Sequence, residues 1–320
     1  MIGYIIKRIL IAIPLLLAII CINFVIIHSA PGDPVGFMIS GVENATPEFM
    51  AMKRAELGLD KPMYIQLLIY LDTILHGDLG YSFIYHLPVA QIIAERLQAT
   101  LLLTVTSFII TVSVGVLAGV SAAKRPYSRT DAFFTIGALG IYSMPDFWIG
   151  LIAILVFSVH FNITPIFGMV DPGLNGWDYW ANLLWHLALP AITLGLGRLA
   201  LYSRLSRASM LEVMRQDYIT TAWAKGCDER TVFYKHGLRN ALLPLVTVLG
   251  FQTSFLFAGA VLTETVFAWP GIGRLLYQSI FFRDYLMIQS LFLVFSILTI
   301  TGNLLADIAY AFLDPRIRYK

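Results

Sequence analysis

The sequence predicts an all-α, polytopic membrane protein with six transmembrane helices and both termini in the cytoplasm. The prediction depends on the composition, on the number of long apolar stretches and on the placement of the basic residues. Of the 320 residues, 58% are hydrophobic and 13% are charged, whereas a soluble domain carries about 25% charged residues. The formal net charge is only +2 and no basic stripe with interleaved aromatics occurs, so we expect no nucleic-acid partner.

Six apolar stretches are long enough to cross the hydrocarbon core of a bilayer, which is about 30 Å thick. They lie at residues 9–29, 99–122, 132–159, 181–202, 241–263 and 285–312. The first follows Lys7 and Arg8 and begins like a signal peptide. Its apolar run is too long for a typical signal sequence, so we interpret it as an uncleaved anchor. The lipid bilayer is therefore the first partner that the sequence predicts.

The basic residues indicate which side of the membrane each loop occupies. They cluster before the first stretch, between the second and third, between the fourth and fifth, and at the C-terminus, whereas none occurs from Thr130 to Gly197. Because short loops rich in Lys and Arg stay in the cytoplasm, all these clusters are expected on the cytoplasmic face. An even number of helices then places both termini there.

Segment 31–98 is expected outside the cytoplasm as a small helical cap. Proline at a helix start and glycine after its end predict helices at 46–58 and 62–77. A third helix is expected to begin near Pro88 and to continue into the second apolar stretch. Such a cap either braces the bundle or forms a docking surface for an external partner, and the sequence leaves both interpretations open.

The connection 204–240 carries the densest charge of the chain. Asp217 as N-cap and Gly226 as stop predict one short helix, and Asp228 and Gly237 delimit a second. Helices shorter than about 12 residues are marginal alone in water, so both need a surface to pack on. The apolar face is narrow and ringed by small and charged residues, which favours a protein partner over the membrane surface.

Several sequence runs resemble the permeases of ABC importers, in the branch that carries dipeptides and oligopeptides. These runs are "AWAKG" at 222–226 and "HGLRNALLP" at 236–244, together with "PGDPV", "YSMPDFW" and "LTETVFAWPGIGR" in the same order. The general loop motif has a glutamate and an alanine where this chain has Thr220 and Thr221, as is normal for the peptide branch. The resemblance implies a type I ABC importer permease fold, with residues 1–320 as one transmembrane permease domain.

The resemblance also implies a role for the 217–240 loop, which lies within the coupling loop 204–240. In this family the short helix before the conserved glycine docks into a cleft on a cytoplasmic ATPase and transmits its ATP-driven closure to the helix bundle. Small side chains there allow close approach, and glycine can turn the chain at positive φ. The residues implied in coupling are Thr220, Thr221, Ala222, Lys225, Gly226, Asp228, Glu229 and Arg230.

The implied assembly contains a second, unlike permease of the same family, two ATPase subunits and an extracytoplasmic substrate-binding protein, in the inner or plasma membrane of a bacterium. The expected cargo is a dipeptide or oligopeptide; nickel chelates and glutathione remain alternatives within the same branch. The sequence contains no GxxxxGK[ST] phosphate loop. We therefore expect no enzymatic activity and no bound cofactor in this chain, with ATP and Mg used by the partner ATPases.

Four residues inside the third apolar stretch, Ser143, Met144, Pro145 and Asp146, are candidates for the translocation path or its gate. A carboxylate at mid-bilayer costs about 2.5–3.5 kcal/mol, so it should face protein or a water-filled path. The alternative is a hydrogen-bonded structural kink at the proline. Glu264, near the outer end of the fifth stretch, is either an external gate residue or an ordinary interfacial acid.

Two other functional classes receive less support from the sequence. An ion-coupled secondary transporter usually has ionisable residues near the bilayer midplane and often inverted repeats, and Asp146 is the sole candidate carboxylate there. A membrane enzyme would need a catalytic motif such as GxSxG or HExxH, which the chain lacks. The six histidines show no ligand-like spacing, so we expect no metal site.

Overall fold

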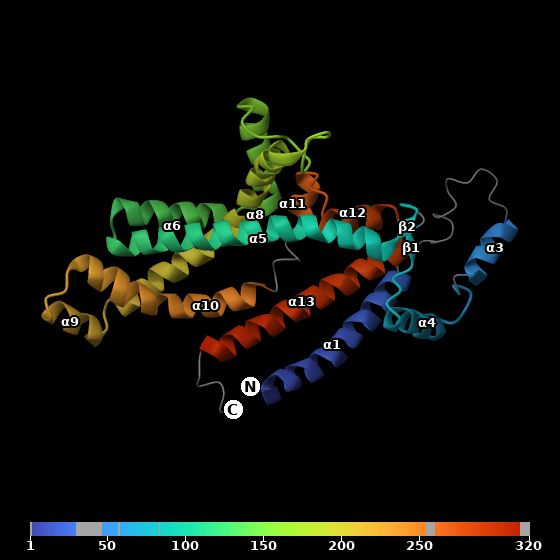
Figure 1. Ribbon diagram of the computed structural model, residues 1–320, viewed down its shortest axis with the longest axis horizontal. Helices are drawn as coiled ribbons and strands as arrows, with labels where there is room; N and C mark the ends of the chain where they lie inside the picture. The colour runs from blue at the N-terminus through green and yellow to red at the C-terminus, as the bar shows by residue number, and fades with distance from the viewer. Residues whose placement is uncertain (1, 30–46, 57, 83, 254–259, 314–320) are drawn as a thin grey trace. The chain divides into compact units, whose positions relative to one another are not determined.

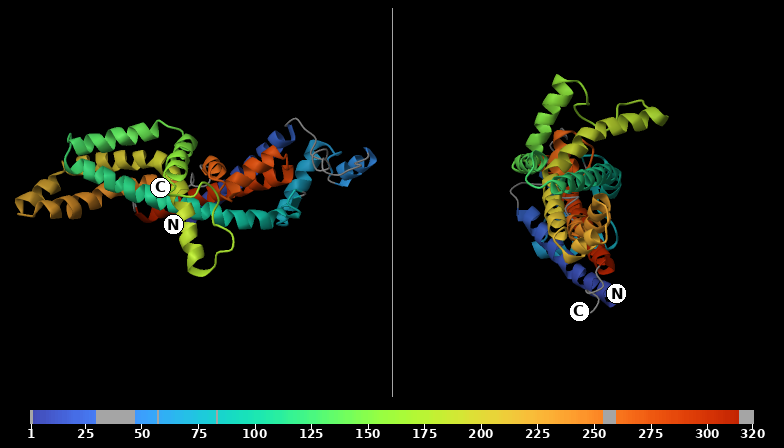
Figure 2. Two further views of the ribbon diagram at one scale, coloured as in Figure 1. Left: turned by 90° about the horizontal axis from the view of Figure 1, so that it is seen from above. Right: turned by 90° about the vertical axis from the view of Figure 1, so that its left-hand side faces the viewer.

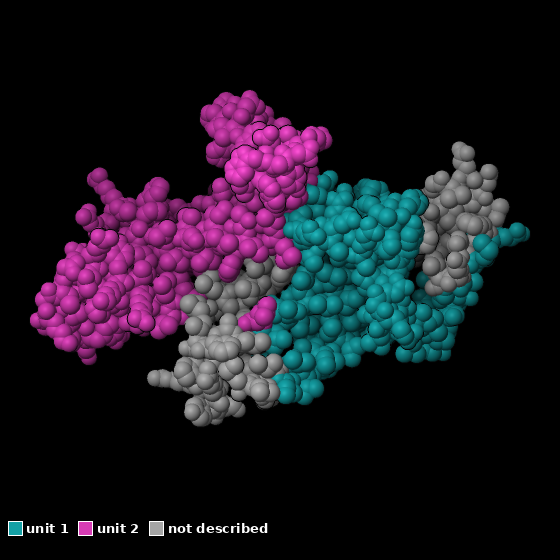
Figure 3. Space-filling model, viewed as in Figure 1, with its two compact units in different colours: residues 1–99, 270–304 teal, residues 100–269, 305–320 magenta. Residues whose placement is uncertain are grey.

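The computed structural model describes residues 2–29, 47–56, 58–82, 84–253 and 260–313, and most of them are helical (Figure 1). The chain forms two compact units, which contain residues 1–99 with 270–304 and residues 100–269 with 305–320 (Figure 3). Within the described ranges, four helices are long and apolar enough to cross a membrane: Arg8–Ser29, Val89–Lys124, Gly176–Val213 and Tyr285–Leu305. A bent helix pair over residues 129–160 makes a fifth span if it is counted as one.

The predicted all-α membrane fold is therefore confirmed, and the first, second, fourth and sixth predicted spans each correspond to a long helix. The fifth predicted span, 241–263, lies partly outside the described residues, because positions 254–259 fall within it. The third predicted span differs from the structure. It consists of two helices that bend by 103° at a short break.

The first unit is built from the two ends of the sequence. Its elements are α1 (Ile2–Ser29), α3 (Pro47–Glu56), α4 (Met63–Leu75), the strands β1 (Tyr81–Ser82) and β2 (Leu87–Pro88), the start of α5 (Val89–Lys124), α12 (Ile272–Phe281) and most of α13 (Tyr285–Leu313). The helices predicted at 46–58 and 62–77 are present, and each is followed by a glycine at positive φ, Gly58 at 66° and Gly77 at 77°. A core of Val89, Ile272 and Met287 with their neighbours joins α5, α12 and α13.

The β-hairpin in this unit was not predicted. Tyr81 pairs with Pro88 and Ser82 pairs with Leu87 in an antiparallel register. The buried Ser82 hydroxyl donates to Asp284 Oδ2 at 2.7 Å, and Asp284 Oδ1 accepts from the Met287 backbone N–H at 3.1 Å. Asp284 thereby caps the start of α13 while it holds the hairpin, so this part of the cap braces the helices of its own unit.

The second unit is organised around α8 (Gly176–Val213). Its other elements are the rest of α5, α6 (Arg129–Tyr142), α7 (Asp146–Ala153), the π-helical segment η1 (Ile154–His160), α9 (Asp217–Ala224), the π-helical segment η2 (Thr231–Leu238), α10 (Arg239–Thr253) and α11 (Val261–Val266). Helices α6, α7, α10 and α11 all contact α8. Helix α8 therefore contacts the helices on both sides of the α6–α7 break and leads at its C-terminal end into the charged connection that contains α9 and η2.

Helices α5 and α8 cross with their backbones in close approach. A Cβ added to Gly115 of α5 would lie 2.9 Å from the Tyr202 Cβ of α8, and one added to Gly119 would lie 2.7 Å from the Ser206 Cβ. Glycines spaced four apart give one helix a groove that a second helix can enter, as in Gly-x-x-x-Gly contacts in membranes. The crossing therefore depends on the absence of side chains at these two positions.

The break between α6 and α7 has a local cause. Pro145 has φ −62° and ψ 136°, an extended conformation that cannot continue the preceding helix. The Ser143 hydroxyl donates to the Leu139 carbonyl at 2.9 Å and satisfies part of the end of α6. Asp146 then begins α7 in a new direction, which is visible as the sharp turn between the two helices (Figures 1 and 2). Proline thus produces a full break where a kink was expected.

Candidate functional site

The predicted coupling loop contains a two-turn helix, α9, which ends at a glycine. Gly226 has φ 78°, and its N–H donates to the Trp223 carbonyl at 2.9 Å while the Cys227 N–H donates to the Ala222 carbonyl at 3.3 Å. Such bonds with a left-handed residue end many helices, and glycine adopts that conformation without strain. The predicted stop at Gly226 is confirmed. The predicted N-cap at Asp217 is one residue too late, because Gln216 occupies the capping position and Asp217 is the first helical residue.

Helix α9 packs on the segment that follows it. Ile219 and Ala222 are buried against Val232 of η2, with Met214 and Cys227 at the edge of the same cluster. A helix of this length is not stable alone in water. The contact with η2 therefore provides the surface that it needs and holds the glycine turn between the two segments.

The other predicted coupling residues lie on the outside of this structure. Thr220, Thr221, Lys225, Gly226, Asp228, Glu229 and Arg230 are exposed, whereas Ala222 is buried. Asp228 accepts hydrogen bonds from Thr231, and these bonds keep the pKa of its carboxyl below the ordinary range. Asp228 therefore caps the second helix as predicted, and it does so as a carboxylate.

The predicted stop of that second helix at Gly237 is wrong. Residues 231–238 form η2, which continues directly into α10. Gly237 is buried, and a Cβ added there would lie 3.0 Å from the Met214 Sδ of the connection after α8. Glycine at this position allows close packing and does not reverse the chain, a distinction that depends on tertiary contacts.

Three exposed aromatic side chains lie on the two segments that flank the glycine turn: Tyr218 and Trp223 on α9 and Tyr234 on η2. Aromatic residues are enriched in protein–protein contacts because they bury a large area with few rotatable bonds. No role was predicted for Tyr218 or Tyr234 from the sequence. The signal that could have identified them is an aromatic residue on each side of the glycine turn, each eight positions from Gly226.

A second feature missed from sequence lies at the α6–α8 contact. Arg207 donates from Nε to Asp131 Oδ1 and from a terminal nitrogen to Asp131 Oδ2, each at 2.6 Å. Asp131 is buried and also accepts from the Tyr127 backbone N–H at 2.8 Å. A bidentate arginine–carboxylate ion pair is strong and fixes the orientation of both side chains. It joins the start of α6 to the part of α8 that leads into the loop.

The predicted path residues occupy three different environments. Asp146, in the first turn of α7, is half-buried beside Gly197 of α8, where an added Cβ would meet its Oδ1 atom. Ser143, Met144 and Pro145 are exposed. Glu264 of α11 is fully buried and accepts a hydrogen bond from the Thr100 hydroxyl of α5 at 2.7 Å.

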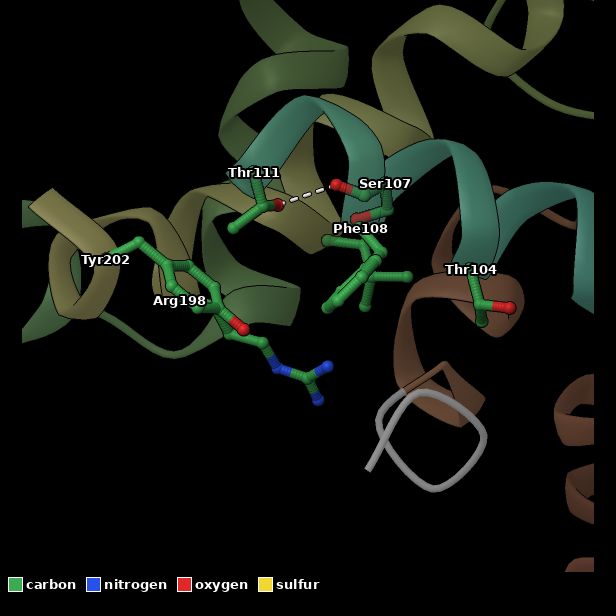
Figure 4. A pocket seen from close by; sticks show the side chains of 7 residues that line it. Thr104, Ser107, Phe108, Thr111, Arg198 and Tyr202 are labelled. Carbon is green, nitrogen blue, oxygen red and sulfur yellow. Dashed lines mark hydrogen bonds between the residues drawn. The ribbon is translucent and has the colours of Figure 1, made fainter. Parts of the chain in front are cut away.

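A recess lies between α5 and α8 (Figure 4). We call it the α5–α8 recess; its lining residues are Thr104, Ser107, Phe108, Thr111, Leu194, Arg198 and Tyr202. The polar residues of α5 recur at helical spacing, and Leu194, Arg198 and Tyr202 follow one another four residues apart, so each set lies on one helix face. Among the described residues, no group of three or more His, Cys, Asp or Glu side chains could hold a metal ion.

Comparison with known proteins identifies relatives over the full length of the chain. Residues 115–319 match the family described as "Binding-protein-dependent transport system inner membrane component", and residues 1–104 match the family described as "Binding-prot-dependent transport system membrane comp, N-term". The dipeptide transport system permease protein DppB of Escherichia coli K12 is 42% identical over 339 residues, and both chains are covered completely.

Two further permeases are similarly related, again with complete coverage of both chains. The oligopeptide transport system permease protein AppB of Bacillus subtilis is 41% identical over 323 residues. The glutathione transport system permease protein GsiC of Escherichia coli K12 is 42% identical over 321 residues. Among solved structures, a chain of the MetNI methionine ABC transporter in inward-facing conformations matches with a TM-score of 0.51 and 16% identity, over 69% of this chain and 97% of that chain. This last likeness concerns the fold alone.

Proposed function

Because the chain belongs to the family of binding-protein-dependent transport system inner membrane components, we propose that it is the permease subunit that forms one half of the translocation path in an ATP-driven peptide importer. The observation that carries this proposal is the full-length similarity to the three peptide-system permeases. Their named cargoes are dipeptides, oligopeptides and glutathione, which is itself a short peptide. A short peptide is therefore the cargo that we assign to this chain.

The proposed complex contains a second, unlike permease, two ATPase subunits that use ATP and Mg, and an extracytoplasmic binding protein that delivers the peptide. The dependence on a binding protein is supported by the family description. In this arrangement the chain is a multi-pass protein of a bacterial inner or plasma membrane. The α9–η2 turn and both termini face the cytoplasm, which agrees with the basic clusters in the sequence.

The α9–η2 turn is the proposed site of contact with an ATPase. Its exposed polar residues include Lys225, Glu229 and Arg230. The short helix α9 packs on Val232 of η2 through its buried face. A rigid knob with exposed aromatics suits insertion into a groove on a protein partner. The Asp131–Arg207 contact and the packing of η2 on α8 then provide a stiff connection from this knob to α6 and α8.

The α6–α7 break and Glu264 are the proposed moving parts of the path. Ser143, Met144 and Pro145 lie at a break where the backbone is already non-helical, which makes it a natural hinge. Asp146 follows the break and interacts electrostatically with Arg198 of α8. Buried Glu264 would close the path in this conformation through its contact with Thr100.

The test is to tag the chain, extract it in mild detergent and identify the proteins that co-purify. Two ATPase chains and a second permease are expected, with ATP hydrolysis that a peptide-loaded binding protein stimulates. A protein that is extracted alone even after cross-linking, and that carries peptide on an ion gradient without ATP, would instead be an ion-coupled secondary transporter.

A further inference from the structure

The α5–α8 recess contains a buried hydroxyl without a partner. The Tyr202 side chain is only 1% exposed, and within the described part of the chain its hydroxyl has no hydrogen-bond partner. The Tyr202 Cβ packs closely against Gly115 of α5. Leaving a buried hydroxyl unsatisfied is unfavourable, so such a group often marks a site that a ligand completes.

A positive charge lies beside this hydroxyl. Arg198 is one helical turn before Tyr202 on α8, and both side chains line the recess (Figure 4). No carboxylate is among the seven lining residues, although Asp146 on α7 interacts electrostatically with Arg198. A guanidinium and a phenol hydroxyl both donate hydrogen bonds, so the two groups together favour an oxyanion.

The remaining polar side chains of the recess support this assignment. The Thr104 hydroxyl donates to the Thr100 carbonyl at 2.8 Å, and the Thr111 hydroxyl donates to the Ser107 carbonyl at 2.7 Å. Because the protons of these two threonines are used on α5 itself, their hydroxyls do not donate to a ligand. The apolar walls, Phe108 and Leu194, lower the local dielectric and strengthen an ionic contact there.

We propose that the α5–α8 recess binds the C-terminal carboxylate of the peptide as it crosses the membrane, with Arg198 and the Tyr202 hydroxyl as donors. This inference rests on the proposed peptide cargo. Every linear peptide has a terminal carboxylate, so a site for this group would accept peptides of any sequence. The site must be weak, because a carrier must also release its cargo.

The experiment uses the complete importer in proteoliposomes, with its binding protein saturated with either a dipeptide or the C-terminal amide of that dipeptide. The measured quantity is the ratio of the two uptake rates. It is compared between the wild type, Arg198→Gln and Tyr202→Phe, with Arg204→Gln as a matched control on the exposed face of α8. Loading of the binding protein is the same for all permease variants, so any contribution from it cancels.

We expect the acid-to-amide ratio to fall at least about tenfold in Arg198→Gln, since a hydrogen bond to a charged group is lost. A smaller fall is expected in Tyr202→Phe, and none in Arg204→Gln. An acid-to-amide ratio equal to the wild-type value in both recess variants overturns the proposal. If the uptake rates of both peptides fall equally in these variants and a co-purifying phospholipid is lost, the proposal is also overturned, and the recess is assigned to a lipid phosphate. If the wild-type complex carries neither peptide and its ATPase is not stimulated, the proposed function itself fails, and the recess proposal fails with it.

Discussion

At the scale of single residues, the contact between Asp131 and Arg207 makes the clearest prediction. Asp131→Asn leaves the guanidinium without its charged partner, although Arg207 keeps a quarter of its side chain in contact with solvent. We expect a loss of about 2 kcal/mol in the free energy of unfolding, seen as a lower Tm of the purified protein in detergent. Glu212→Gln removes an exposed carboxylate from α8 and serves as the control. Equal Tm values for the two variants would contradict the structural role of the pair.

Asp131 and Arg207 also show where residue-level prediction from sequence ended. Both lie near the ends of predicted apolar stretches, where an isolated charge is ordinary, and 76 positions separate them. The charges that could be interpreted were those close to a local signal, such as Asp228 three residues before the Thr231 N–H that it accepts. A pair that forms only when α6 packs on α8 leaves no local pattern. The same holds for Arg198 and the recess that it lines.

At the scale of elements, the glycine turn after α9 makes the first prediction, because Gly226 ends the proposed coupling helix. Gly226→Pro fixes φ near −65°, whereas the structure requires 78°, and it removes the N–H that donates to the Trp223 carbonyl. We expect loss of peptide uptake and of peptide-stimulated ATP hydrolysis, with normal membrane insertion, measured in proteoliposomes. Gly226→Asn is the matched control because asparagine tolerates the left-handed region. Normal uptake by the proline variant would exclude the coupling role.

The α5–α8 crossing gives a second prediction at this scale. Gly119→Ala places a Cβ against the Ser203 carbonyl and the Ser206 Cβ, so the two helices must separate. Overpacking of this kind costs about 1–3 kcal/mol, which a thermal unfolding experiment on the purified protein would detect. Gly137→Ala on α6 is the control, since an added Cβ there meets nothing within 4 Å. A Gly119→Ala protein as stable as this control would mean that the helices do not approach so closely.

The elements themselves differed in how well the sequence predicted them. The cap helices α3 and α4 follow from proline and glycine at their ends, which act locally, and the long helices follow from their apolar lengths. The continuation of η2 through Gly237 did not follow, because the role of that glycine is set by Met214 across the contact. The full break at Pro145 also exceeded the expected kink. Proline predicts a disruption, but the direction that α7 takes after it, where α7 contacts α8 and α11, has no signal in the local sequence.

At the scale of the whole molecule, the energy source for uptake is reflected in how three acids of the second unit are held. Proton-coupled carriers need ionisable groups that can exchange protons along the path. Here Asp131 is bound by Arg207, Glu264 is buried against Thr100, and Asp146 interacts with Arg198. Asp131 and Glu264 are therefore each held by a protein partner, which suits a path driven mechanically from outside the chain.

We therefore expect peptide uptake by the complete importer in proteoliposomes to require ATP on the side of the α9–η2 turn and to continue when a protonophore abolishes the pH gradient. The appropriate control omits the ATPase subunits while keeping both permeases, and it should show no uptake under an imposed pH gradient. Uptake in that control would mean that the permeases themselves use the pH gradient to drive transport. Asp146, the acid beside the α6–α7 break, would then be the first residue to test, because Asp146→Asn should abolish gradient-driven uptake while leaving ATP-driven uptake measurable.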